Sequence, residues 1–404
     1  MTHPILPSDA NSSGREFGED ELKFLREALD SGNLFAPRGT QVKALEREFA
    51  AHFGVAEAYG VTSGTAAVHV AVAAVDPEPG DEIITTPITD MGALTPILMQ
   101  NAIPVFADVD PMTLNVTPDS IAARITSRTK AIIVTHLFGA AADMDGIMAV
   151  ARERGIPVIE DSAQAYETWY KGRLCGTIGD IGCFSFQQTK HMTTGEGGMV
   201  VTNNPTLGRF SRLFRDKSWP YGEELMDHLY LGINYRMPEL VGAVGRAQLR
   251  RVKSVVARRQ AAAARFNDAI RSLPGLTVAE PRPGDTHSYW KYPLMVDANV
   301  LPGGAAALGK LVKDRGVLVA PNYIQKPAYK CKVFVDRKTY GKSQFPYTDP
   351  SRAGLPLLGY TDEECPGAIA GLAQVLVVPW NEFFTEEHVD FIAGCIKESV
   401  QCLI

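Results

Sequence analysis

The residue of this chain best suited to chemistry is Lys190, because of the segment that surrounds it. An apolar run from Cys183 to Phe186 leads toward it, and a glycine-rich turn, residues 195–198, follows it. A lysine held on such a turn is positioned, and partial desolvation lets it lose its proton near neutral pH and form a Schiff base with a carbonyl. A surface lysine beside a tight turn is the alternative that this segment alone leaves open.

A pair of carboxylates, Glu160 and Asp161, follows a strand-like apolar run that ends at Ile159. In open α/β sheets the ligand crevice lies at the carboxyl ends of the strands, so Asp161 is placed to meet a ligand. Pyridoxal phosphate (PLP) needs both a lysine for its aldehyde and an acid that keeps its ring nitrogen protonated. Asp161 as an ordinary helix cap is the alternative.

A third segment, Ser63-Gly64-Thr65, opens an apolar helix-like run of small residues. The free N–H groups and the dipole at the start of a helix favour an anion, and the small hydroxyl side chains add donors. The segment therefore predicts a phosphate cradle, although not a Walker loop, since no Gly-Lys-Ser/Thr follows. An ordinary capped helix would leave the same signature.

Together these segments resemble the DegT/StrS family of sugar and cyclitol aminotransferases, which share the fold type of aspartate aminotransferase. The matching pieces, in chain order, are Ser63-Gly64-Thr65, His136 to Gly139, Ala142 to Asp145, Glu160-Asp161 with Ala163-Gln164, Gly179 to Phe186, Lys190 with residues 195–198, and Gly232 to Met237. The likeness extends from about residue 17 to about residue 250. A lysine at position 190 also argues against the dehydratase branch of the family, which carries histidine there.

The resemblance implies a role for each matching residue. Lys190 would hold PLP as a Schiff base and then carry the proton between substrate and cofactor, while Asp161 would pair with the pyridine nitrogen. Gln164 would contact the ring or its phenolic oxygen. The residues expected at the phosphate are Ser63, Gly64, Thr65 and Ser185. Asn234 resembles the residue that reaches the phosphate of the neighbouring subunit, which implies a homodimer with shared active sites.

One position departs from the family pattern. Where the family usually carries an aromatic residue that stacks on the PLP ring, an ungapped comparison places Asp90, which cannot stack. Three explanations are open: the comparison is out of register, Met91 covers the ring, or Asp90 meets a polar group of the substrate, which makes Asp90 a substrate candidate. Gln187, His287 and Tyr323 are the other substrate candidates, and His191 is expected to pack rather than to act as a base.

Composition narrows the class of protein. The net charge of −6 argues against a nucleic-acid footprint, and 45% hydrophobic with 21% charged residues is ordinary for a globular protein. The first residues lack a signal peptide's apolar core, and no apolar run approaches the roughly 18 residues of a membrane helix. The six cysteines form no CxxC pair, so we expect a cytoplasmic protein with reduced thiols and no metal site.

The alternation of strands and helices between residues 55 and 202 predicts an α/β protein with a mostly parallel central sheet flanked by helices. With the resemblance, this is PLP-dependent transferase fold type I. We expect a large PLP-binding domain over residues 1–255, with an N-terminal helical arm, and a smaller α+β domain over 256–404. Residues 1–16 are expected to be loosely ordered. The arginines of the helix-like stretch 238–266 are expected on a solvated face: Arg246, Arg250, Arg251, Arg258 and Arg259.

The function expected from the resemblance is a transamination from glutamate or glutamine to a keto-sugar or keto-cyclitol, in amino-sugar or aminocyclitol biosynthesis such as that of antibiotics or cell-surface glycans. The pair Gln187-Gln188 favours a cyclitol acceptor. Another PLP reaction on a cyclic substrate, an aminodehydration or a lyase reaction, is an alternative. A PLP-binding regulatory protein without turnover is another, which Asp90 keeps open.

Overall fold

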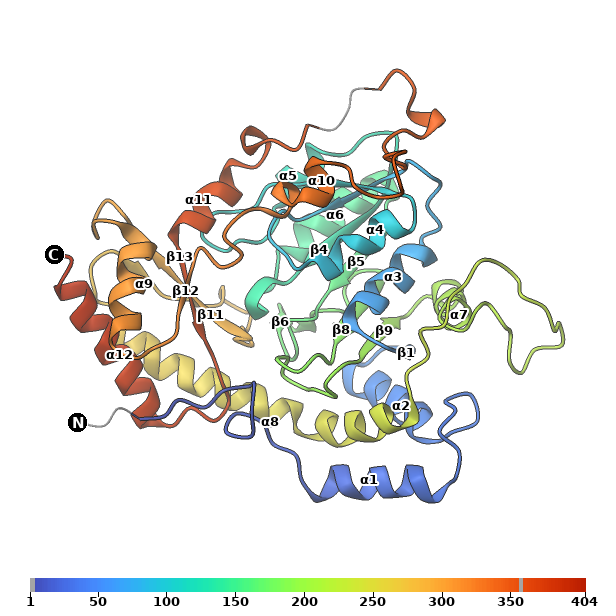
Figure 1. The fold of residues 1–404 in the computed structure, drawn as a ribbon, viewed down its shortest axis with the longest axis horizontal. Coiled ribbons are helices and arrows are strands. Elements are labelled where there is room, and N and C mark those ends of the chain that lie inside the picture. The colour runs from blue at the N-terminus through green and yellow to red at the C-terminus, as the bar shows by residue number, and fades with distance from the viewer. Residues whose placement is uncertain (1–3, 356–358) are drawn as a thin grey trace.

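A computed structural model describes residues 4–355 and 359–404 of the chain. Its centre is a seven-stranded sheet with the spatial order β1-β9-β8-β5-β4-β2-β3, in which β9 runs antiparallel to both neighbours and all other pairs run parallel (Figure 1). The strands are β1 (Glu57–Val61), β2 (Glu82–Thr85), β3 (Ile103–Phe106), β4 (Thr129–Thr135), β5 (Val158–Asp161), β8 (Ile181–Ser185) and β9 (Gly198–Thr202). The predicted α/β class with a mostly parallel sheet is confirmed.

Helices cover both faces of this sheet, because successive strand residues point to opposite sides. Ile133 packs with α3 in one apolar cluster, whereas its neighbours Ile132 and Val134 pack with α6 in another. The helices of this part are α1 (Glu19–Asp30), α2 (Gln41–Phe53), α3 (Gly64–Ala74), α4 (Thr95–Met99), α5 (Pro118–Ala122), α6 (Met144–Arg154) and α7 (Pro205–Phe214). A buried sheet of this kind fixes the strand ends that carry the candidate site.

A second, antiparallel sheet lies at the C-terminal side of the molecule in the order β10-β11-β13-β12 (Figure 1). Its strands are β10 (Leu276–Thr277), β11 (Lys291–Val296), β12 (Ala320–Pro321) and β13 (Val375–Pro379), and its helices are α9 (Gly304–Asp314), α11 (Pro366–Gln374) and α12 (Glu386–Gln401). Short elements complete the chain: β6 (Trp169–Tyr170), β7 (Arg173–Leu174) and α10 (Lys332–Val335).

The long helix α8 (Glu239–Ile270) runs along both parts of the molecule and contacts α1 and α2 at one end and α12 at the other (Figure 1). The domain boundary expected between residues 255 and 256 falls inside this helix, and it stays a prediction. One strand of the central sheet, β1, was not expected. Its sequence, Glu-Ala-Tyr-Gly-Val, mixes poor strand formers with good ones, and its pairing with β9 supplies the order that local propensity does not.

Two expectations about charge and order are wrong. Arg259 is completely buried rather than on a solvated face, whereas Arg250 and Arg258 are exposed as expected. The described part of the N-terminal segment is anchored, since Arg15 is buried against Glu382. A periodic pattern cannot reveal such burial, because the partner carboxylate lies more than a hundred residues away in sequence.

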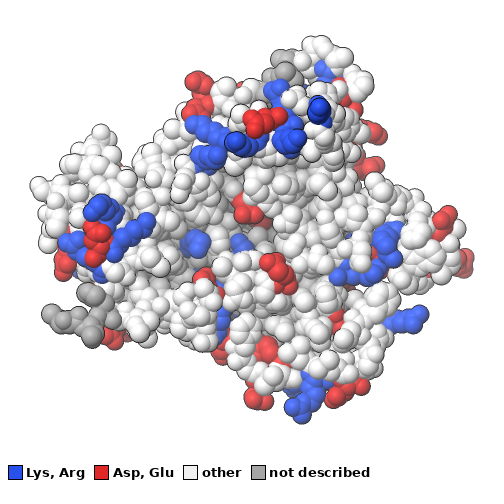
Figure 2. Space-filling model, in the orientation of Figure 1, with Lys and Arg blue, Asp and Glu red and all other residues white. Residues whose placement is uncertain are grey.

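Charges of both signs are interspersed on the face of the molecule drawn in Figure 2, so no single sign dominates it. Among the described residues, no helix is both long and apolar enough to cross a membrane.

Candidate active site

The three segments singled out in the sequence meet at one cavity of about 440 Å³. They meet because β5 and β8 are parallel neighbours, so their carboxyl ends share an edge of the sheet, and α3 starts beside that edge. Ten of the predicted residues line the cavity: Ser63, Gly64, Thr65, Asp90, Asp161, Gln164, Ser185, Gln187, Lys190 and Tyr323. The cavity is therefore the candidate active site.

The N-terminus of α3 forms a narrow cradle beside the end of β8. Ser63 caps the helix, its Oγ accepting the N–H of Ala66 at 3.0 Å. Gly64 allows close approach, since a Cβ there would lie 2.6 Å from Cβ of Ser185. The first N–H groups of a helix have no intrahelical partner, and here they open among three hydroxyl side chains. The donor set fits the phosphate of the expected PLP.

Asp161 ends β5 with its carboxylate held in place. Its Oδ1 accepts the N–H of Ala163 at 3.1 Å, and the hydroxyl of Thr135 lies 3.4 Å from Oδ2. Burial raises the pKa of Asp161, and the hydrogen bond from Ala163 and the charge of Lys190 oppose that rise. A buried carboxylate fixed in this way suits a protonated ring nitrogen, whose positive charge would stabilise it further.

The neighbouring carboxylate, Glu160, has a structural role. It accepts hydrogen bonds from His136 and from the backbone N–H groups of Gly176, Ile178 and Gly179, and so ties the turn after β7 to β5. Among the described residues, Glu160, His136 and Cys175 place possible metal-ligand atoms close together. The oxygens of Glu160 are already used by four donors, so we interpret the group as an internal hydrogen-bonded anchor for the Asp161 strand.

Lys190 sits on the turn after β8, with its backbone N–H bonded to the Gln187 carbonyl oxygen at 2.9 Å. Its Nζ lies 3.8 Å from the centroid of the Trp290 ring. Burial lowers the pKa of Lys190 to about 8, with Asp161 and Asp90 acting against the shift. A lysine with this pKa is partly neutral near physiological pH, as a nucleophile and proton carrier must be.

Asp90 and Tyr323 lie at the mouth and wall of the same cavity. Asp90 caps the 3₁₀ turn η1 (Met91–Ala93), with its Oδ1 accepting the N–H of Gly92 at 2.8 Å. Tyr323 packs edge-on against Phe138 with ring centroids 4.7 Å apart. Its phenolic oxygen accepts a hydrogen bond from the Gln164 side chain, whose Oε1 in turn accepts the N–H of Phe138 at 2.7 Å. Tyr323 thus supplies an aromatic ring in the cavity, whereas Asp90, at the position where the family usually has an aromatic residue, does not.

Three candidate residues lie apart from this cavity. His287 is buried and stacks on Tyr289 at 4.0 Å between ring centroids, lining a separate cavity. Asn234 is exposed on the segment before α8, and its side chain accepts the N–H of Arg236. His191 points away, its Nε2 within 2.9 Å of the Ser288 carbonyl oxygen, which agrees with the packing role expected for it.

Eight further residues line the cavity, and four of them have a polar or indole side chain to which the sequence analysis gave no role of its own: Thr89, Thr189, Glu196 and Trp290. Thr189 and Glu196 flank Lys190 in the same turn, so their proximity to Lys190 could have identified them. Trp290 precedes β11, a hundred residues further along the chain, and only tertiary structure brings it to the lysine.

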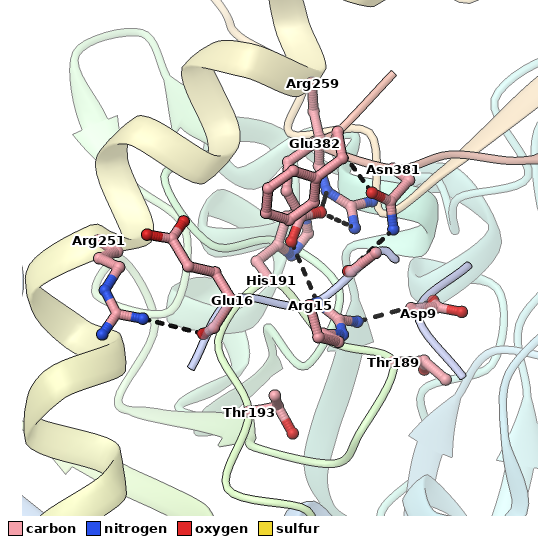
Figure 3. Close-up of polar contacts among 12 residues, drawn as sticks. Asp9, Arg15, Glu16, Thr189, His191, Thr193, Arg251, Arg259, Asn381 and Glu382 are labelled. Atoms are coloured by element: carbon pink, nitrogen blue, oxygen red, sulfur yellow. Dashed lines mark hydrogen bonds and ion pairs between the residues drawn. The ribbon is translucent and has the colours of Figure 1, made fainter. Parts of the chain in front are cut away.

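The N-terminal segment contacts the turn that carries Lys190, which is called the lysine turn below. The side-chain amide of Gln188 donates to the Asp9 carbonyl oxygen at 2.9 Å, and Arg15 pairs with Glu382, which also pairs with Arg259 of α8 (Figure 3). These contacts join three remote parts of the chain next to the turn that holds Lys190. The turn is therefore held by tertiary contacts as well as by its own hydrogen bonds.

Comparison with known proteins agrees with this geometry. A profile of the DegT/DnrJ/EryC1/StrS aminotransferase family matches residues 15–363. The chain is 32% identical over 399 residues to the spore coat polysaccharide biosynthesis protein SpsC of Bacillus subtilis (strain 168), covering 95% of each chain. The X-ray structure of an aminotransferase from Psychrobacter cryohalolentis superimposes with a TM-score of 0.84 at 31% identity, covering 96% of this chain and 98% of the other.

The crystal structure of 3-amino-5-hydroxybenzoic acid synthase has a TM-score of 0.86 at 25% identity, covering 99% of this chain and 100% of that one. With a cavity that joins a lysine, a buried aspartate and a phosphate cradle, these likenesses leave one assignment. The chain belongs to the DegT/DnrJ/EryC1/StrS aminotransferase family and is an aminotransferase that depends on pyridoxal phosphate.

Proposed function

We propose that the protein moves an amino group from glutamate or glutamine to the keto group of a sugar or cyclitol, in the biosynthesis of an amino sugar or aminocyclitol. The observation that carries the proposal is the convergence of Lys190, Asp161 and the cradle at Ser63 on one cavity. When bound, PLP supplies an aldehyde for the amino group and a protonated ring that withdraws electrons from the neighbouring carbon.

Different residues of the chain would bind the cofactor and transfer the proton. Ser63, Thr65 and Ser185 hold the phosphate, and Asp161 keeps the ring nitrogen charged. Lys190 would accept the proton from the carbon that carries the amino group in the donor. It would later give a proton to the carbon that receives the amino group in the acceptor. A pKa of about 8 suits both steps. A single base can serve both directions because the proton stays within the cavity.

The cavity walls support a polyhydroxylated acceptor. Asp90 has one carboxylate oxygen committed to the N–H of Gly92, which leaves the other for a hydroxyl of the substrate. Gln187 and Tyr323 line the same space. Acidic and amide groups of this kind suit a neutral sugar or cyclitol better than an acceptor with negative charge at its ring.

The active site is proposed to be shared between two subunits. Asn234 lies on an exposed segment, away from the cavity of its own chain, and the same segment exposes the apolar side chains of Tyr221, Leu225, Met226 and Leu231. Exposed apolar groups in one segment are typical of a surface that is covered in an oligomer. A homodimer would let Asn234 reach the phosphate in the neighbouring subunit.

The cellular site is proposed to be the cytoplasm. The six cysteines are all free in the structure. Free thiols of this number are maintained in a reducing compartment.

Aminodehydration of a cyclic substrate is the second candidate, supported by the structural likeness to 3-amino-5-hydroxybenzoic acid synthase. The two reactions differ in their need for a donor. A transaminase needs an amino acid to load the cofactor with nitrogen, whereas the dehydration of a cyclic amino ketone uses the amino group that the substrate already carries and releases water.

The test is an absorbance spectrum of the purified holoenzyme at roughly 330 and roughly 410 nm, before and after adding L-glutamate or L-glutamine, since the cofactor reports its own state. Loss of the long-wavelength band in favour of the short one supports the donor assignment. A subsequent keto-cyclitol or keto-sugar that restores the long-wavelength band identifies the acceptor class. A long-wavelength band that responds to neither amino acid contradicts the proposed donors.

A further inference from the structure

Trp290 lies in the wall of the cavity with two lysine side chains over its indole. Nζ of Lys190 is 3.8 Å from the ring centroid, and Nζ of Lys291 is 4.7 Å from the centroid of the same residue. Only 8% of the surface of Trp290 is exposed, so protein covers most of the ring. Two positively charged side chains over one desolvated indole repel each other, so their placement there calls for an explanation.

The indole is fixed with respect to the turn that carries Lys190. Its Nε1 donates to the Thr189 carbonyl oxygen at 2.9 Å, and the backbone N–H of Trp290 donates to the Phe138 carbonyl oxygen at 2.9 Å. Thr189 directly precedes Lys190. The ring that receives the ammonium group therefore also bonds the turn on which the lysine sits, and the two cannot move apart independently.

We propose that Trp290 docks the amine of Lys190 whenever that amine is free of the cofactor, and that Lys291 prevents the docked amine from being held too firmly in its protonated form. The inference rests on the transamination proposed above, because such a cycle leaves the lysine amine free after the amino group has moved to the cofactor. Trp290 and Lys291 are positioning residues in this scheme, since they act through Lys190.

The physical argument has two opposing parts. An ammonium group over the face of a desolvated indole is stabilised, and tryptophan is the best of the aromatic residues for this contact. The ring therefore favours charged Lys190, as do the carboxylates of Asp161 and Asp90. Burial and the positive charge of Lys291 favour the neutral amine. Glu196 also lines the cavity and adds a further carboxylate to the groups around Lys190.

Lys291 has charged neighbours in other parts of the chain. It begins β11 and is partly buried, and burial lowers its pKa. The charge of Asp9 favours the charged form of Lys291, whereas the charges of Arg259 and Arg15 disfavour it. The charge state of Lys291 therefore depends on groups of the N-terminal segment and of α8.

The experiment measures the pKa of Lys190 in enzyme reconstituted with pyridoxamine phosphate, a holo form in which no covalent bond to the lysine exists. Competitive labelling with acetic anhydride across a pH series, read by mass spectrometry of the peptide that holds Lys190, gives that pKa, with exposed Lys310 as the internal reference. The variants are Trp290→Leu, Trp290→Phe and Lys291→Met. Circular dichroism of each variant establishes that the fold is kept.

Trp290→Leu should lower the pKa of Lys190 by about one unit, because the charged form loses its aromatic partner. Trp290→Phe should lower it by less, since a weaker π-face remains, and it also serves if the leucine variant does not fold. Lys291→Met should raise the pKa of Lys190 by about half a unit, because a nearby positive charge is gone.

An unchanged or raised pKa of Lys190 in both Trp290 variants would show that the ring only excludes water, and would overturn the docking role. An unchanged or lowered pKa in Lys291→Met would overturn the role of the second lysine.

Failure here is separable from failure of the proposed function. The labelling uses added pyridoxamine phosphate and so needs no turnover. A wild-type enzyme that does not respond to glutamate or glutamine contradicts the proposed donors, whatever the labelling shows. Normal turnover in the wild type with no change in the variants' Lys190 pKa contradicts only the docking role.

Discussion

At the scale of single residues, the site depends on groups whose charge state is set by burial. Lys190 is brought to a pKa of about 8 because the protein around it disfavours an ammonium ion. Asp161, under the same burial, has its pKa raised, and hydrogen bonding from Ala163 limits that rise. Burial therefore shifts the pKa values of the two side chains in opposite directions, and each residue can be tested by its own substitution.

Lys190→Ala should abolish the adduct that borohydride traps between the protein and its cofactor, because Lys190 is the lysine among the described residues that line the cavity. Lys291→Met is the matched control, since it removes the second lysine at the same indole and should leave the adduct in place. Peptide mass spectrometry after reduction locates the adduct. An adduct that survives in Lys190→Ala would move the assignment to another lysine.

Asp161→Asn should keep cofactor binding but reduce turnover by roughly 100-fold or more, because an amide cannot stabilise a charged ring nitrogen as a carboxylate does. Thr135→Val, which removes only the weak 3.4 Å contact to Asp161, is the milder comparison and should lose less than tenfold. Steady-state kinetics beside a cofactor titration separate the two effects. Equal turnover in Asp161→Asn and the wild type would exclude the assigned role.

At the scale of elements, the cradle depends on how closely α3 approaches β8. A Cβ at Gly64 would come 2.6 Å from Cβ of Ser185, which is backbone-supported and cannot retreat far. Gly64 lies in ordinary helical geometry, so the requirement is one of space rather than of backbone conformation. The sequence predicts the cradle at the start of α3, and a reason for its glycine became visible only beside β8.

Gly64→Ala should weaken retention of the cofactor by about tenfold or more, because α3 must shift away from the phosphate donors to relieve the clash. Gly394→Ala is the matched control, since that glycine lies within α12 and its added methyl meets nothing within 4 Å. The control should be neutral or slightly stabilising. Fluorescence titration of the apoenzyme with PLP measures both, and equal affinity in the two variants would contradict the cradle.

At the scale of the whole molecule, buried charge joins parts that are distant in sequence. Arg259 of α8, Arg15 of the N-terminal segment and Glu382 after β13 form one buried group beside the lysine turn (Figure 3). Arg259 also donates to the carbonyl oxygens of Tyr289, Trp290 and Trp380. Glu382 is therefore shared by two buried guanidinium groups, and Arg15 has a second, longer ion pair with Asp9 at 3.7 Å.

Glu382→Gln should lower the free energy of unfolding by about 3 kcal/mol or more, because two buried arginines lose their shared counter-charge while the side-chain shape is kept. Glu386→Gln is the control, an exposed partner of Arg265 whose loss should cost less than about 1 kcal/mol. Urea unfolding of both variants gives the comparison. Equal stability losses would mean that the buried group contributes little.

A shared active site makes a further prediction for the assembly. Lys190→Ala and Asn234→Asp should each be nearly inactive alone, the second because a carboxylate repels the phosphate of the neighbouring subunit. Refolding the two variants together should restore up to about a quarter of the wild-type activity, because heterodimers contain one site with both native residues. Mixing Lys190→Ala with Asp161→Asn should restore none, since those two residues belong to the same cavity. The absence of recovery in the first mixture would place Asn234 outside the partner's site.

The sequence by itself determined the local parts: the lysine turn, the carboxylate at a strand end, the small-residue helix start and the alternation that predicts a parallel sheet. These features follow from neighbouring residues, so periodicity and turn chemistry report them. Only the tertiary structure decided that Trp290 and Lys291 meet Lys190, that His287 lies in another cavity, that β1 joins the sheet, and that Arg259 is buried. The outcomes for Trp290, Lys291, β1 and Arg259 depend on contacts between residues about a hundred or more positions apart, and the packing of remote segments, not local propensity, determines them.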